Sequence, residues 1–182
     1  CLGQAQTLTF PSNASLTREI AEPLASYAFP VGVWDGTQVP VNVAEGQVTQ
    51  QAWRIATDAL TSLQLLRPLR EQLRNDRYRV LFECEGQTCG GFDFRFAIDV
   101  LPPPEMQISL RDFRQLTAQK EGANGAEVIS VLVSRTSQAG YVQVVHVGPA
   151  DPTSQAQPIS VAAANPATDA VPDGVAGQLD QA

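Results

Sequence analysis

The sequence predicts an α+β fold: a mainly antiparallel sheet of about five strands, one principal helix packed on a face of that sheet, and a disordered tail. Leucines at steps of three and four within residues 60–75 indicate the helix. Residues 111–119, 127–135 and 141–148 read as three strands, and residues 136–140 have the length of a hairpin loop. No series of alternating strands and helices appears, so neighbouring strands should run antiparallel.

The predicted helix has one apolar and one charged side. Its apolar face consists of Leu63, Leu66, Leu69 and Leu73. Its charged side consists of Arg67, Arg70, Glu71 and Arg74. Thr57, Asp58 and Thr61 offer side-chain oxygens that can cap the N-terminus. Pro68 leaves two alternatives: the helix starts near Thr61 and bends at the proline, which we favour, or residues 60–66 are partly extended and the helix starts at Arg67.

The remaining segments are predicted less uniformly. Residues 78–82 form an apolar strand that ends at Cys84. Residues 6–58, interrupted by several prolines, read as short strands and loops, with residues 46–56 as the clearest strand. Phenylalanines alternate with charged residues at 92–96, which is a strand period, yet Phe92 and Phe96 also share a face at helical spacing. Both interpretations of this segment stay open.

Three regions are expected along the chain. Residues 15–148 form the globular domain, and residues 149–182 form a linker rich in Pro, Ala and Asp that leads towards a missing C-terminal domain. Residues 1–14 are a secretory remnant or a lipoprotein-type lead-in. In the lipoprotein alternative Cys1 is the lipid attachment site; in the other, residues 1–5 are the end of a signal peptide. Both alternatives place the protein outside the cytoplasm.

Composition narrows the class of function. With 43% hydrophobic and 17% charged residues the chain is globular. A net charge of −7 argues against nucleic acid as a partner, because phosphate binding needs clustered Lys and Arg. No run of about 18 apolar residues is present, so no transmembrane helix is expected.

The paired cysteines are predicted to be structural. Cys84 and Cys89 enclose four residues at the end of a strand and should form a disulfide bond in an oxidising compartment. A redox pair normally has two intervening residues at a helix start, so we favour the structural bond. A metal site lacks further ligands, since His146 is the only histidine.

No residue reads as catalytic, cofactor-binding or metal-binding. His146 is expected to be packed or solvated on a strand face, because no nucleophile motif accompanies it. Glu83 and Glu85, and the Arg111–Asp112–Arg114 cluster, are expected to be surface charges. Trp34 and Trp53 are expected in the core, with a ligand groove as the alternative. We expect no enzyme activity and no cofactor.

The order of these pieces resembles a periplasmic domain of unknown function that precedes OmpA-like domains in Gram-negative envelope proteins. The resemblance covers residues 15–148, and its most specific part is the loop CEGQTCGG at residues 84–91. It implies a location in the periplasm, associated with the outer membrane. It also implies that peptidoglycan would be bound only by a C-terminal domain beyond Ala182.

The expected function follows from that resemblance rather than from composition or spacing. The chain is expected to be a non-catalytic interaction or spacer domain of an OmpA-family protein that contributes to cell-envelope organisation, with an unidentified envelope protein as partner. The alternative is a freestanding periplasmic module that binds a ligand or protein in an aromatic groove lined by Trp34, Trp53 or the phenylalanines of residues 92–96.

Overall fold

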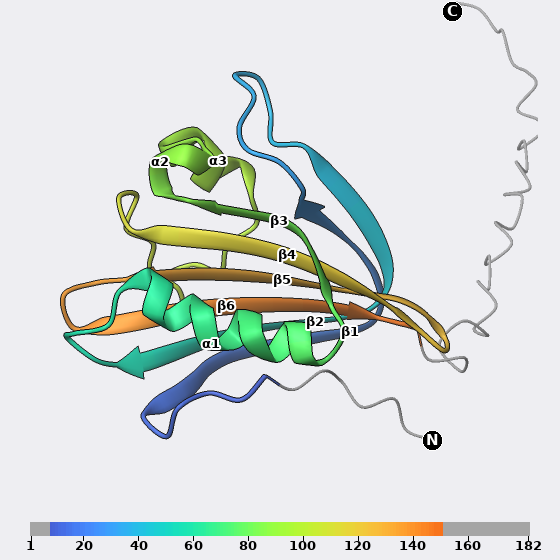
Figure 1. Ribbon diagram of the computed structural model, residues 1–182, viewed down its shortest axis with the longest axis horizontal. Coiled ribbons are helices and arrows are strands. Elements are labelled where there is room, and N and C mark those ends of the chain that lie inside the picture. The colour runs from blue at the N-terminus through green and yellow to red at the C-terminus, as the bar shows by residue number, and fades with distance from the viewer. Residues whose placement is uncertain (1–7, 151–182) are drawn as a thin grey trace, which may run out of the picture.

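A computed structural model describes residues 8–150. Its six strands are β1 (Ala14–Pro30), β2 (Val41–Ala56), β3 (Arg79–Glu85), β4 (Phe113–Gly122), β5 (Gly125–Arg135) and β6 (Ala139–Gly148). Its helices are α1 (Ser62–Asn75), α2 (Gly86–Cys89) and α3 (Gly91–Ala97). The strands form one sheet in the order β1-β2-β6-β5-β4-β3, and every neighbouring pair is antiparallel (Figure 1).

The predicted α+β class, with about five strands and one principal packed helix, is wrong. The described part of the chain is mostly sheet, and its three helices have 14, 4 and 7 residues. The largest difference is β1, a 17-residue strand in a region predicted to be short strands and loops. Pro23 is tolerated inside β1 because β1 is an edge strand and Pro23 falls at an irregularity of its pairing with β2, between Glu22 and Ala25.

The structure does not describe the two ends of the chain. Residues 1–7, including Cys1, and residues 151–182 of the predicted linker are outside the described residues. Within residues 8–150, no helix is long and apolar enough to cross a bilayer.

The helix α1 runs unbroken from Ser62 and contains Pro68, so the alternative that it begins at Arg67 is wrong. Thr61 caps it: its side chain accepts from the N–H of Gln64, whose own side chain accepts from the N–H of Thr61. The side that packs on the sheet consists of Leu65, Leu66, Leu69 and Leu73.

The predicted apolar face of α1 is therefore partly wrong. Leu63 is 40% exposed, whereas Leu65, which the prediction left out, is buried. Leu65, Leu69 and Leu73 are separated by steps of four and so lie along one stripe of the helix, with Leu66 beside it. The step of three from Leu63 to Leu66 also fits a helix, but Leu63 lies at the margin of the surface that α1 packs against the sheet.

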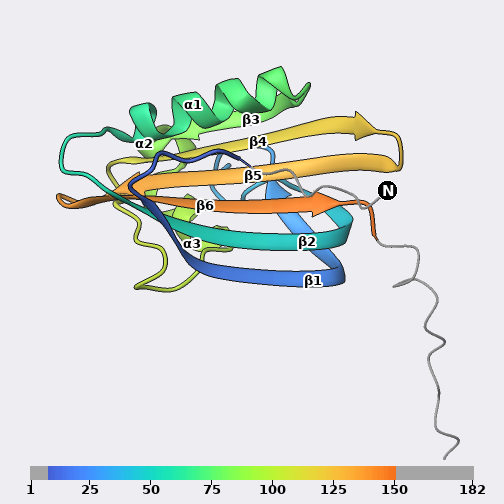
Figure 2. The ribbon, with the colours of Figure 1, turned by 90° about the horizontal axis from the view of Figure 1, so that it is seen from below.

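Two main cores lie on opposite faces of the sheet (Figure 2). The first is formed by α1 against alternate residues of the central strands, including Leu116, Ile129 and Val142. The second lies on the other face and gathers α3, the disulfide, the segment 98–108 and Phe113. Because both faces of these central strands are covered, β6 is buried along its whole length, β5 from Val128 to Ser134, and β4 mainly from Phe113 to Ala118.

The second face is also covered by a part of the sheet itself. β2 pairs with β6 only from Gln47 onward, so residues 25–30 of β1 and 41–46 of β2 pair with each other alone. This hairpin arm, residues 25–46, folds over the face opposite α1 (Figure 1). At its end, the carbonyl of Pro30 accepts a 2.7 Å hydrogen bond from the Thr117 hydroxyl of β4.

Beneath the arm and the segment 98–112, the sheet carries buried polar side chains that are hydrogen-bonded. Gln115 donates to Ser130 at 2.8 Å. Gln143 accepts from the N–H of Leu101 at 2.8 Å and donates to the carbonyl of Asp99 at 3.0 Å. These bonds offset the cost of burying amides and attach the covering segments to the sheet.

Truncating a buried and an exposed leucine of α1 tests this packing. We expect Leu66→Ala to lower the free energy of unfolding by about 2–5 kcal/mol, because its side chain is fully buried. The matched variant Leu63→Ala should cost less than about 1 kcal/mol. Urea unfolding monitored by circular dichroism measures both, and equal losses would contradict the observed orientation of α1.

Candidate binding site

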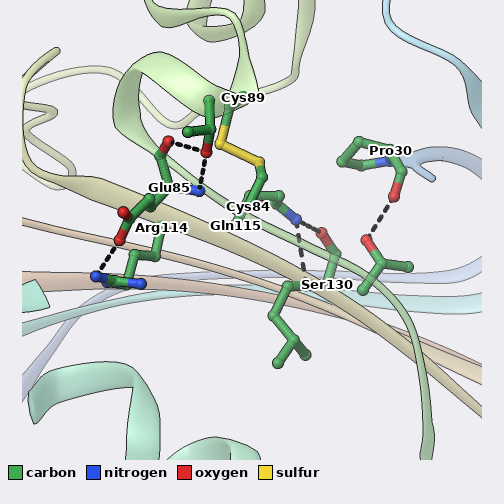
Figure 3. The surroundings of a disulfide bond; sticks show 10 residues. Pro30, Cys84, Glu85, Cys89, Arg114, Gln115 and Ser130 are labelled. Atoms are coloured by element: carbon green, nitrogen blue, oxygen red, sulfur yellow. Dashed lines mark hydrogen bonds and ion pairs between the residues drawn. A yellow bond between two sulfur atoms is a disulfide. The ribbon is translucent and has the colours of Figure 1, made fainter. Parts of the chain in front are cut away.

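The site begins at the disulfide at the end of β3. The sulfurs of Cys84 and Cys89 lie 2.03 Å apart, which is the bond that the sequence predicts (Figure 3). The four residues of α2 form a tight turn between Glu85 and Gly90. Glu85 pairs with Arg114 of β4, and the Thr88 hydroxyl donates to the carbonyl of Glu85 at 2.7 Å. The loop is thus held both covalently and by contacts to the neighbouring strand.

Gly90 turns the chain from this loop into α3. It adopts φ 119°, in the left-handed region that favours glycine, and Gly91 follows at φ 55°. A Cβ at position 90 would lie 2.3 Å from the Cβ of Trp34 in the arm. The N–H of Trp34 donates to the carbonyl of Cys89 at 2.8 Å. The tip of the arm therefore rests directly on the start of α3.

The three phenylalanines of α3 divide between core and solvent. Residues 91–97 are helical, which resolves the two open interpretations of this segment. Phe94 is fully buried between Phe82 and Phe113. Phe92 and Phe96, one helical turn apart, lie on the opposite side with 59% and 66% of their surface exposed. Their ring centroids are 4.5 Å apart, so they form one continuous aromatic surface.

This exposed pair lines a groove of about 560 Å³. The α3 groove is lined by Phe92, Arg95, Phe96, Pro103, Met106, Gln107, Ile108 and Leu110. Arg95 is the charged residue of this lining, and its guanidinium carbon lies 5.3 Å from the centre of the Phe96 ring. Burial lowers the pKa of Arg95 below its usual value, which indicates a partly desolvated cation. The groove thus offers apolar surface and one positive charge.

The tryptophans are not part of this groove. Trp53 stacks on Phe10 at 4.4 Å between centroids and packs against the first core. Trp34 packs against the second core. Both tryptophans are therefore half-buried at the margins of the two cores. Of the aromatic residues proposed for a groove, only Phe92 and Phe96 line this one.

A polar cluster lies on the α1 face of the sheet, formed by Tyr78, Lys120, Glu127 and His146. One carboxylate oxygen of Glu127 contacts His146 Nε2 at 3.2 Å, the Tyr78 hydroxyl at 3.1 Å and Lys120 Nζ at 3.4 Å. The Lys120 ammonium also lies 4.6 Å from the Tyr78 ring centre. Tyr78 and His146 are 3% and 8% exposed. The side chains are directed at one another, so His146 is a packed strand residue, as expected.

Burial and contacts shift the acidities in this cluster. Burial lowers the pKa of His146 below its usual value, and the neighbouring Glu127 only partly opposes this. Burial opposes ionisation of Glu127, but the hydrogen bonds from His146 and Tyr78 and the charge of Lys120 outweigh it and lower its pKa. Burial, followed by the charge of Glu127, raises the pKa of Tyr78. At neutral pH, Glu127 is therefore ionised and the neighbouring His146 is neutral.

Four of the remaining charged candidates form ion pairs between elements: Glu83, Glu85, Asp112 and Arg114. Glu83 pairs with Arg70 of α1, and Glu85 with Arg114. Asp112 accepts from the Ser62 hydroxyl and pairs with Arg135 rather than with its sequence neighbours. These contacts join α1, β3, β4 and β5, so the predicted surface charges connect elements. Among residues 8–150, no group of three or more His, Cys, Asp and Glu side chains could hold a metal ion.

Sequence reasoning missed one wall of the α3 groove. This wall consists of Pro103, Met106, Ile108 and Leu110, which lie in a segment without helical or strand periodicity. Their spacing carries no signal of a groove, because the groove arises only when α3 is placed beside them.

No protein-family model matches this chain, and no curated protein is significantly similar to it in sequence.

Removing the disulfide should destabilise the domain. We expect Cys84→Ala/Cys89→Ala to lower the free energy of unfolding by about 2 kcal/mol, the value for so short a loop in the chain-entropy model. The measurement is urea unfolding of both proteins, and wild-type protein unfolded with a reductant should show the same loss. Equal stability of variant and oxidised wild type would contradict a stabilising bond.

Acidification should destabilise the domain through His146. Because its folded pKa is lowered, the unfolded chain binds the proton more tightly, and stability falls as pH drops below the unfolded value of about 6.5. The lowered pKa of Glu127 adds a second loss, as pH falls below the unfolded value of about 4.3 through the folded one.

Since His146 is the only histidine, His146→Gln should flatten the dependence of unfolding free energy on pH between about 7 and 5. Urea unfolding at a series of pH values measures this slope. An equally steep slope in the variant would contradict the assignment.

Proposed function

We propose that this chain is a non-catalytic interaction domain of the bacterial envelope, and that it binds a segment of a partner protein in the α3 groove. The observation that carries the proposal is the exposure of Phe92 and Phe96 side by side. Large aromatic side chains exposed next to each other are characteristic of contact surfaces, where they bury much area at little entropic cost.

The charge of the groove indicates the chemistry of the partner. Arg95 lies over the Phe96 ring and is partly desolvated, so a carboxylate on the partner would regain the interactions that Arg95 has lost from water. The fitting occupant is a peptide segment with a large apolar anchor for the phenylalanines and an acidic residue for Arg95.

The envelope location rests on two further supports. A disulfide between Cys84 and Cys89 is typical of oxidising compartments such as the periplasm. The resemblance of residues 15–148 to the domain preceding OmpA-like domains supports a periplasmic, outer-membrane-associated protein of the OmpA family. Peptidoglycan contact would then belong to a domain after Ala182 and not to these residues.

A freestanding ligand-binding module is the second candidate. The groove volume of about 560 Å³ falls in the range typical of small-molecule sites. The coding sequence after Ala182 separates the two contexts, because an OmpA-like continuation supports the first and a stop codon removes it.

Peptide selection tests the binding function. A displayed library of random peptides, selected against the chain, should yield sequences that combine an aromatic or large aliphatic residue with Asp or Glu. Phe96→Ser should lower the affinity for these peptides, measured by fluorescence anisotropy, at least about tenfold, because exposed aromatic anchors dominate such contacts. The control is Val43→Ser, which alters a comparably exposed apolar residue on the arm.

Peptides that bind wild type and Phe96→Ser equally would contradict the α3 groove as the site. Soluble muropeptides are tested in parallel. If they bind with Phe96 dependence while no peptide does, the small-ligand candidate replaces the protein-binding one.

A further inference from the structure

The outer edge of the sheet carries a long open strand. β1 stands at one end of the strand order, and within residues 8–150 no strand pairs with its outer side (Figure 2). Residues 15–24 are exposed, except for a half-buried Ile20. An open edge presents unpaired N–H and C=O groups to any further strand. Sheet extension at this edge would form a contact surface separate from the α3 groove.

The usable part of this edge is short and regular. The pairing of β1 with β2 is irregular between Leu16 and Arg18, and again between Glu22 and Ala25. Between these irregularities, residues 18–22 pair in unbroken register with residues 48–52. Pro23 has no N–H to donate, so a ladder with a new strand would end there.

The charges on this run are left unpaired by the domain. Arg18 and Glu22 are exposed, and neither forms an ion pair within residues 8–150. Four residues of extended strand separate them by about 13 Å, so they cannot reach each other within one chain. Both point to the same side of the strand as Ile20, which lies midway between them.

We propose that β1 pairs with β1 of a second copy of this chain, antiparallel and centred on Ile20. In such a two-fold pairing the residues before the centre face those after it, so Arg18 of each copy lies opposite Glu22 of the other. Directly opposite side chains lie about 5 Å apart, close enough for an ion pair. The two Ile20 side chains meet at the centre, and the two sheets become one.

The order of Arg18 and Glu22 along β1 distinguishes a strand that pairs with its own copy from an edge strand whose charges only prevent pairing. Charges and prolines on edge strands often prevent pairing, and like charges would do so here. A symmetric pairing instead brings opposite charges together twice. Since the contact involves few residues and exposed ion pairs contribute little each, association should be weak and should weaken further with salt.

Charge reversal tests the pairing in the complete chain. Sedimentation equilibrium at low salt should show a concentration-dependent dimer. Arg18→Glu and Glu22→Arg should each weaken it at least about tenfold, because each places like charges opposite one another. The double variant R18E/E22R should restore it. An equimolar mixture of the two single variants should also restore it, because one strand then carries two carboxylates and the other two cations.

Two controls keep the result specific. Asp58→Arg makes the same change in net charge as Glu22→Arg, at an exposed position outside β1, and should leave the dimer unchanged. Hydrogen exchange of the Arg18–Glu22 amides in the wild type should slow with increasing protein concentration, which needs no variant to fold. A monomer at all concentrations, or a dimer that tolerates both single reversals, overturns the proposal. A dimer that is lost in Phe96→Ser also contradicts the β1 pairing, because it would place the dimer contact at α3.

Discussion

The hydrogen bond from the Trp34 N–H to the Cys89 carbonyl joins two parts of the chain that approach the second face of the sheet from different directions. The arm arrives from the β1 edge, and the disulfide loop arrives from β3 at the other edge. Where they meet, Gly90 leaves no room for a Cβ, and Trp34 fills the contact. Each part fixes the other, and together they close the second core. The placement of α3, and therefore of its exposed phenylalanines, follows from this junction.

The two faces of the sheet are stabilised in different ways. The face beneath α1 is covered by leucines on aliphatic residues, a contact that tolerates small shifts because it is not directional. The opposite face combines apolar residues with Gln115, Thr117 and Gln143, whose hydrogen bonds require particular partners. A sheet pairing displaced by two residues would leave these amides and hydroxyls unpaired in a buried position. The polar face thus contributes to choosing one strand register.

The sequence predicts best where local pattern and tertiary environment agree. Apolar residues recur on both faces of β5 and β6, so these strands and the loop between them are readable from the sequence, as are Thr61 as helix cap and the Cys84–Cys89 bond. β1 is exposed along most of its length and contains Pro23, so neither hydrophobic alternation nor propensity marks it as one strand. Alternate phenylalanines at 92–96 fit a strand, but a seven-residue helix satisfies them by burying Phe94 alone. The second wall of the α3 groove was beyond sequence reasoning, because an aperiodic segment joins α3 there only through tertiary packing.

The direction in which β6 runs has a consequence for how the domain would be presented from an anchor. Gln107 and Ile108, which line the α3 groove, also lie with Arg135 and Thr136 near the start of β6. β6 then runs the length of the sheet to Gly148, and the chain leaves beside Gly46 at the far end (Figure 1). A tether attached through the residues after Ala150 would hold the molecule by the end remote from its aromatic surface. The α3 groove would then face away from the attachment point, where a partner that is not attached to the same anchor could reach it.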